Sequence, residues 1–392
     1  MINLLRVLIL LTLFLTPLLG PGQLGFEQTK VVFFIIMTSL SGLLWLYLIS
    51  QDKLKIKWDK LNIACLVFIL WLLVSSLFGV DPRVSLLGAQ PYLQGWLTYL
   101  YLYLFFLIVR SVKVYFEQLV TVLSLSAFLV AAVAIKEWMI INLFHGYVPT
   151  YGGRIVSTFG QPNLYSGFIL LTIPLQYFLL KNSKNLKQKA IFLGLILSIL
   201  AILISQSRTA IFILGILLII PFIKKIKALI VVLAVVTVAV TIWLIRSELL
   251  ISQDNIWLNY NSPEKRVFIW PILWGQFLER PLIGYGLENI PTAYSGFFGK
   301  VNFNTLNSPS YHGLKNLKID RAHNYILDLS LFSGIIGVLF WLAIFYLIFR
   351  KTKNTTLKIC LLTYLIWIQF QPQGIVQLIY FWLLTATSEG NF

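Results

Sequence analysis

Long apolar runs constrain this chain more than any other feature. Stretches close to the roughly 20 residues that a helix needs to cross a bilayer recur from the first residues almost to the last. Of the 392 residues, 58% are hydrophobic and only 11% are charged, whereas a soluble domain carries about 25% charged residues. A set of soluble domains is therefore excluded, and the sequence predicts one all-α polytopic membrane domain over residues 1–392.

Hydropathy predicts twelve membrane spans, with eleven as an alternative that joins the last two spans across Gln371-Pro372-Gln373-Gly374. The first run carries Arg6 and could resemble a signal peptide, but Pro21-Gly22-Gln23 lacks a small-residue cleavage pattern, so a helix is expected. The predicted spans cover residues 2–19, 30–49, 61–79, 92–109, 116–136, 163–180, 189–204, 209–223, 228–245, 324–348, 357–370 and 375–386.

The basic residues predict the orientation of these spans. The chain holds 31 basic and 14 acidic residues, a net charge of +17, which in a soluble protein would suggest nucleic acid. Here the basic residues form short clusters between apolar spans, and most lie on one side when alternate loops are placed on opposite sides. By the positive-inside rule both termini are predicted to be cytoplasmic. A shorter loop, 137–162, and a long loop with short helices, 246–322, then face outward, and no nucleic-acid partner is expected.

Arginines stand beside three helices that are expected to begin on the outer side. Arg154 precedes the sixth span, Arg208 lies in a polar break before the eighth, and Arg321 precedes the tenth. The free N–H groups and the positive dipole end of such helices point outward. Helix N-termini and guanidinium groups both bind phosphate well. The sequence therefore predicts an outer site for an anion such as a lipid diphosphate.

Further residues are expected to support this site. Asn163 is a favourable N-cap for the sixth span and Ser207 for the eighth. Ser262 followed by Pro263 predicts the start of another helix, which would carry Arg266. A single loop arginine is more often solvated or paired, and Asp320 and Arg321 could simply pair with each other. The prediction rests on the joint placement of the arginines.

His323, next to Arg321 and Asn324, is the candidate base. Neighbouring cations and the positive end of a helix disfavour imidazolium, which would keep the ring neutral and ready to accept a proton. The alternative is a structural histidine that caps a helix; His145 and His312 lie in loops without comparable neighbours and are expected to be structural. The outer loops show no paired carboxylates at a metal-binding spacing, and Cys65 and Cys360 lie inside apolar runs. No metal and no other cofactor is expected.

The order of these segments resembles the O-antigen ligase and polymerase (Wzy-type) family of bacterial membrane glycosyltransferases. The segments follow one another on one side of the predicted spans, within about 150 to 340. They are Arg154 through Asn163, Ser205-Gln206-Ser207-Arg208, Arg266 to Trp270, Arg280-Pro281-Leu282-Ile283-Gly284-Tyr285-Gly286-Leu287-Glu288-Asn289, and Ala322-His323-Asn324-Tyr325 with Leu327, Gly334 and Gly337. Taken without the resemblance, Gly284-Tyr285-Gly286 predicts only a loop turn.

The resemblance implies a multi-pass protein of the bacterial cytoplasmic membrane with its active site on the outer face. It implies transfer of a saccharide from a polyprenyl diphosphate carrier, such as undecaprenyl diphosphate, to a hydroxyl of a glycan, lipid or protein, without nucleotide sugar or metal. Similar enzymes invert the anomeric centre and use a histidine as base and arginines for the diphosphate. Carried onto this chain, His323 is the base, Arg154, Arg208 and Arg266 hold the donor phosphates, and Arg321 is a further donor contact. Ligase and polymerase stay open.

Two other functional classes compete with this interpretation. A lipid-linked saccharide flippase or other transporter would place charged groups and helix breaks near the bilayer midplane. The polar breaks in this chain gather instead at one predicted boundary, which favours an enzyme that works at one surface. A purely structural subunit would leave the arginines beside His323 without a reason.

Overall fold

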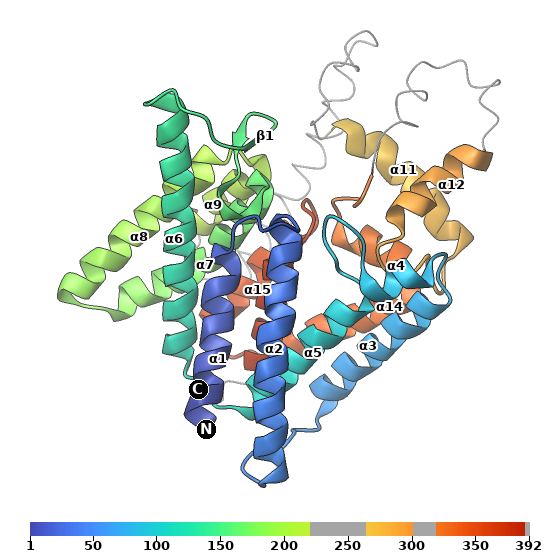
Figure 1. Ribbon diagram of the computed structural model, residues 1–392, viewed down its shortest axis with the longest axis horizontal. Coiled ribbons are helices and arrows are strands. Elements are labelled where there is room, and N and C mark those ends of the chain that lie inside the picture. Colours follow the sequence, from blue (N-terminus) through green and yellow to red (C-terminus); the bar gives the residue numbers. More distant parts are fainter. Residues whose placement is uncertain (220–263, 301–318, 389–392) are drawn as a thin grey trace.

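The computed structural model describes residues 1–219, 264–300 and 319–388. Within these ranges the chain is almost entirely helical, and most helices pack side by side along their length (Figure 1). The helices are α1 (Ile2–Leu15), α2 (Phe26–Ser50), α3 (Lys60–Leu77), α4 (Pro82–Leu87), α5 (Trp96–Ser111), α6 (Phe116–Asn142), α7 (Pro162–Asn182), α8 (Asn185–Ile204), α9 (Arg208–Ile219), α11 (Glu264–Glu279), α12 (Ile290–Lys300), α14 (Tyr325–Lys351), α15 (Thr355–Trp367) and α16 (Ile375–Thr387), with short 3-10 turns at Thr16–Leu18 and Ser157–Phe159.

Each predicted span that falls within the described residues has a helix at or near its predicted place; the ninth, 228–245, lies outside them. Among the described residues, six helices, α2, α3, α6, α7, α8 and α14, are long and apolar enough to cross a membrane. The chain is therefore consistent with a polytopic membrane protein. The last predicted pair forms two separate helices, α15 and α16, and the number of crossings stays a prediction.

The all-helical prediction omitted one small element. Strands β1 (Thr150–Tyr151) and β2 (Arg154–Ile155) form an antiparallel hairpin between α6 and α7. Gly152 and Gly153 make its turn, with φ of +57° and +75°, and two left-handed residues are what a tight hairpin of this kind requires. The predicted loop from 137 is also shorter than expected, because α6 continues to Asn142. The hairpin fixes the position of Arg154.

Two predicted N-caps differ from the structure. Pro162 takes the first position of α7, which makes Gln161 the cap residue and puts Asn163 inside the first turn. Ser207 does precede α9, and its carbonyl accepts the first helical hydrogen bond, from Ile211 N. However, its buried hydroxyl has no hydrogen-bond partner, so the side chain does not cap the helix. The predicted capping role is therefore wrong for Asn163 and for the Ser207 side chain.

The centre of the helical packing is formed by α7 and α16, whose residues are buried on nearly all sides. The close approach of α15 to α7 requires a glycine, which has no side chain, at one position of α7. A Cβ on Gly167 of α7 would overlap the indole of Trp367 in α15. By contrast, α8 exposes most of its apolar surface, as expected for a helix that faces lipid. The fold therefore holds α9 and α15 against α7.

A break inside α14 positions the loop that precedes α12. Gly334 has φ +65° and ψ −174°, which interrupts the helix. Around this break the loop at 281–286 makes backbone hydrogen bonds with α14, from Tyr285 N to Leu331 O at 2.6 Å and from Gly286 N to Phe332 O at 3.0 Å. The hydroxyl of Ser75 in α3 donates to Ile283 O at 2.8 Å. The predicted loop turn is confirmed, and it is fixed to two helices.

The hairpin and the start of α1 lie toward opposite ends of the molecule. Figure 1 shows β1 and α11 near the top of the view, whereas the N-terminus before α1 lies near the bottom. The predicted site segments therefore gather at one end of the helices. Which side of a membrane that end faces stays a prediction.

Substituting Gly334→Ala should lower the free energy of unfolding by about 1 to 3 kcal/mol. Alanine disfavours the left-handed φ of +65°, and its Cβ would overlap the Leu282 carbonyl. The matched control is Gly215→Ala in α9, where a Cβ meets open space. Thermal unfolding in detergent measures both variants. Equal unfolding temperatures would show that the break in α14 is not required.

Candidate active site

His323 lies in the short loop directly before α14. Its backbone is left-handed, with φ +57°, an uncommon conformation for a residue other than glycine. Its Nδ1 atom is buried and has no hydrogen-bond partner. Burial, together with the charges of Arg266 and Arg321, lowers the pKa of His323 to about 3. The ring is therefore neutral at physiological pH, in agreement with the sequence-based expectation, while its role as a base stays a prediction.

Arg321 is buried and does not pair with Asp320. Its guanidinium forms an ion pair with Glu288 and donates to Gln94 Oε1 at 3.1 Å. The same group lies over the rings of Tyr92 and Phe332, at 4.6 and 5.0 Å from their centroids. Burial alone would lower the pKa of Arg321, but the nearby carboxylates raise it above its ordinary value, first that of Glu288. Arg321 is therefore charged and largely occupied.

The donor-binding role predicted for Arg321 now rests on a single atom. Only Nη1 is buried without a hydrogen-bond partner. Glu288, its ion-pair partner, was not predicted from the sequence. It follows the Gly284-Tyr285-Gly286 turn, and Asn289 fixes this loop to α4 by donating to Ser85 Oγ at 2.7 Å. The signal that could have indicated Glu288 is that it is the only acidic residue between Arg280 and Asn289, in a segment that carries the family resemblance.

Arg266 lies on the first turns of α11, next to His323. Burial lowers the pKa of Arg266 to about 10, so the guanidinium stays charged at neutral pH. One turn later, Trp270 donates from Nε1 to Ala322 O at 2.8 Å. This bond docks α11 directly against the His323 loop. The helix predicted here is confirmed; Ser262 and Pro263, expected to begin it, lie outside the described residues.

Arg154 and Arg208 form a second group. Arg154 is partly buried in β2, and burial, followed by smaller effects that include the repulsion from Arg208, lowers its pKa. Arg208 is the exposed first residue of α9. Within the described part of the chain, no carboxylate pairs with either arginine. Two neighbouring guanidinium groups without an acidic partner are suited to bind an anion.

Residues 368–374, between α15 and α16, connect the two groups; we call them the bridging segment. On one side, Tyr325 N donates to Ile368 O at 2.9 Å and Asn324 Nδ2 to Gln369 O at 3.3 Å. On the other side, Gln371 Nε2 donates to Thr209 Oγ1 at 2.9 Å, next to Arg208. The bridging segment thus contacts residues adjacent to both His323 and Arg208.

Glutamines complete this network. Gln94 Nε2 donates to Gln373 O at 2.8 Å, and the Oε1 atom of the same amide accepts from Arg321. Asn324, expected to support the site, is the N-cap of α14 and accepts from Leu327 N at 3.0 Å. The amides were missed because they come from separate loops and form no motif in the sequence.

The predicted residues therefore meet as two linked groups, Arg154 with Arg208, and Arg266 and Arg321 with His323. In the described residues, no three His, Cys, Asp or Glu side chains lie together in an arrangement that could hold a metal ion. Metal-independent chemistry stays a prediction.

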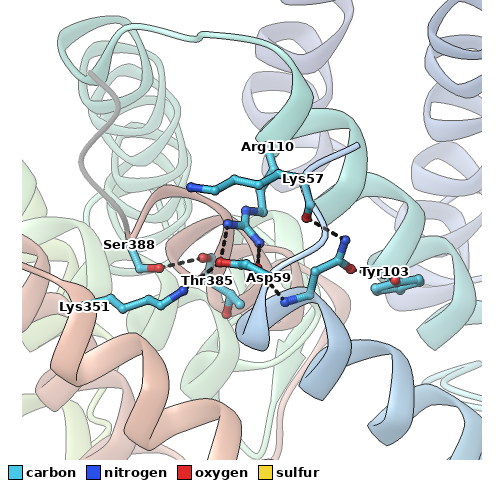
Figure 2. Close-up of polar contacts among 8 residues, drawn as sticks. Lys57, Asp59, Tyr103, Arg110, Lys351, Thr385 and Ser388 are labelled. Atoms are coloured by element: carbon cyan, nitrogen blue, oxygen red, sulfur yellow. Dashed lines mark hydrogen bonds and ion pairs between the residues drawn. The ribbon is translucent and has the colours of Figure 1, made fainter. Parts of the chain in front are cut away.

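A separate polar cluster lies at the far end of α14 (Figure 2). Asp59, the N-cap of α3, accepts two hydrogen bonds from Arg110 of α5 at 2.8 and 3.1 Å and one from Lys351 at 2.6 Å. Because α14 begins beside His323 and ends at Lys351, its 27 residues separate this cluster from the site. The cluster ties three helices together, and we assign it a structural role.

Residues 193–342 match the family described as O-antigen ligase. This range holds Arg208, Arg266, Arg321 and His323, whereas Arg154 lies outside it. The chain is 25% identical over 374 residues to a candidate polysaccharide ligase of Rickettsia typhi. The aligned region covers 89% of this chain and 86% of that protein. These matches support an O-antigen ligase-like family for this chain. The resemblance found in the residue pattern is thereby confirmed.

Two further relatives match over shorter stretches. The chain is 27% identical over 208 residues to the ComP-specific O-oligosaccharyltransferase of Acinetobacter baylyi, covering 50% of this chain and 35% of that protein. It is 29% identical over 93 residues to a candidate polysaccharide ligase of Rickettsia conorii, covering 24% and 21%. The chain thus spans about a third or less of the length of these two relatives. No solved structure matches it.

The half-buried, neutral His323 should make the fold sensitive to acid. Its pKa of about 3 in the folded protein lies below the value of about 6.5 in an unfolded chain. As pH falls below about 6.5, the unfolded chain binds a proton that the folded chain does not, so stability decreases. The unfolding temperature should therefore fall more between pH 7 and about pH 5 for the wild type than for His323→Gln. Parallel curves would contradict the lowered pKa.

Proposed function

We propose that the chain is a membrane glycosyltransferase of the O-antigen ligase type. It transfers a saccharide from an undecaprenyl-diphosphate-linked donor to an acceptor hydroxyl on the outer face of the bacterial cytoplasmic membrane. The observation that carries this proposal is a half-buried, neutral imidazole whose buried Nδ1 has no hydrogen-bond partner, beside Arg266 and Arg321. The printed names of the relatives, which describe an oligosaccharyltransferase and polysaccharide ligases, support it.

In this proposal Arg154, Arg208 and Arg266 bind the donor diphosphate, and His323 accepts the proton of the acceptor hydroxyl. The acceptor oxygen attacks the anomeric carbon as the bond from that carbon to the diphosphate breaks. The electron pair of the broken bond stays on the diphosphate, where the guanidinium groups stabilise its growing charge. Because diphosphate is already a good leaving group, positioning and electrostatic stabilisation supply most of the catalysis. Attack from the opposite face inverts the anomeric centre.

The two charges near His323 link its basicity to donor binding. Burial and the charges of Arg266 and Arg321 lower the pKa of His323. A bound diphosphate places negative charge beside Arg266 and offsets this repulsion, which raises the pKa towards the ordinary value. The imidazole is then a stronger base when a donor is present than when the site is empty.

Two observations favour this assignment over its alternatives. The buried charges Glu27 and Lys30 lie in the first turns of α2, and Asp328 lies in the first turn of α14. Charges at the ends of helices do not mark a transport path through the bilayer midplane, which disfavours a flippase. Between ligase and polymerase, the names of the relatives favour a ligase.

Substituting His323→Ala should abolish saccharide transfer, since general-base catalysis contributes about 10² to 10⁴-fold. Binding of the carrier should stay close to that of the wild type, because the arginines are unchanged. The measurement uses purified protein, a carrier-linked saccharide and an acceptor in liposomes, and records whether chains lengthen, move to another acceptor or only cross the membrane. Full turnover by this variant, or transport without transfer by the wild type, would contradict the proposal.

Substituting Arg154→Ala or Arg208→Ala should weaken use of the donor by roughly 1.5 to 3 kcal/mol for each lost charge-assisted hydrogen bond. Lys53→Ala is the matched control, because this exposed lysine follows the far end of α2, whereas the start of that helix contacts the turn at Ser157–Phe159 through the bond from Lys30 Nζ to Thr158 O. The dependence of initial rate on donor concentration measures all three variants. If Arg154→Ala and Arg208→Ala behave like the control, the phosphate assignment is wrong.

A further inference from the structure

Gln371 occupies a central position in the bridging segment. Its side chain is 4% exposed, and its Nε2 atom donates to Thr209 Oγ1 at 2.9 Å. The other polar atom of the amide, Oε1, is buried and has no hydrogen-bond partner. A buried carbonyl oxygen without a partner is unfavourable. In native proteins such an atom calls for a ligand or an ordered water.

The surroundings of Gln371 hold further polar atoms of the same kind. The Ser207 hydroxyl, two residues before Thr209, is buried and without a partner. On the other side of the bridging segment, His323 Nδ1 is also buried and unpaired. Unsatisfied polar atoms therefore lie on both sides of Gln371, along the connection between Arg208 and His323. This is where the reacting part of a donor would have to lie if both groups act on it.

The chemistry of the free atom selects its ligand. Oε1 is a hydrogen-bond acceptor and needs a donor. A diphosphate offers only acceptor oxygens at neutral pH, so it does not satisfy this atom. The hydroxyl groups of a sugar do, and the sugar that is transferred is bonded directly to the diphosphate. Gln371 is anchored to the residue that follows Arg208, a proposed phosphate ligand, which places its amide at the correct end of the donor.

We propose that Gln371 binds a hydroxyl group of the sugar that is attached to the diphosphate, and so contributes to selection of the donor saccharide. The proposal rests on the proposed function, since it assigns the sugar part of the same site. The distinguishing property of such a residue is that it recognises the sugar and not the carrier. A residue that only holds the bridging segment in place would affect both.

The test compares the binding of two probes to the full-length protein in nanodiscs. One probe is undecaprenyl diphosphate, and the other is undecaprenyl diphosphate that carries N-acetylglucosamine. The wild type should bind the sugar-bearing probe about fivefold more tightly, as expected for one added hydrogen bond. Gln371→Met, which keeps the length of the side chain, should reduce this ratio to about one and leave the affinity for the bare carrier unchanged.

Two further variants make the outcome decisive. Gln188→Met, an exposed glutamine near the start of α8, is the matched control and should retain the wild-type ratio. Thr209→Val removes the anchor of the Gln371 amide and should also lower the ratio, so it replaces Gln371→Met if that variant does not fold.

The proposal is overturned if the wild type binds both probes equally, or if Gln371→Met weakens both by the same factor. If the wild type binds neither probe, the proposed function fails as well. Loss of the sugar preference with full binding of the bare carrier supports both.

Discussion

The buried ion pair between Arg321 and Glu288 is the interaction on which the site depends. Burying two charges is costly unless further hydrogen bonds satisfy them, and here Gln94 supplies one to the guanidinium. Glu288 reaches this position because its loop is bound to the broken segment of α14. The pair therefore joins the loop before α12 to the residue two positions before His323. Between Arg321 and His323, Ala322 is held as well, because its N–H donates to Asp328 Oδ1 and its carbonyl accepts from Trp270 Nε1.

This arrangement separates the charges into two kinds. Arg321 is held by a carboxylate, whereas Arg154 and Arg208 have no acidic partner among the described residues. Arg266 is partly buried and lies beside a neutral ring rather than beside an acid. The site thus carries an excess of positive charge that a bound anion would balance. A bound anionic donor would also offset the repulsion from the arginines and so raise the pKa of His323.

The parts of this picture that the sequence predicted are those encoded locally. Apolar length predicted the helices, and the position of each arginine beside a polar break predicted where cations gather. What the sequence missed depends on contacts between distant segments. Glu288 meets Arg321 only because Gly334 breaks α14, and Gln371 reaches Thr209 only because the start of α9 lies beside the end of α15. The cap at Gln161 was missed for a local reason, because the preference of proline for the first helical position outweighed the capping tendency of Asn163.

The central claim is that the two groups of residues bind one lipid diphosphate. A structure of the protein with undecaprenyl diphosphate, determined by electron cryo-microscopy, measures this directly. The account predicts phosphate oxygens within about 2.7 to 2.9 Å of guanidinium nitrogens of Arg208 and Arg266, with the imidazole of His323 beside them. A diphosphate found instead at the cluster of Asp59, Arg110 and Lys351, or in contact with only one of the two groups, would contradict it.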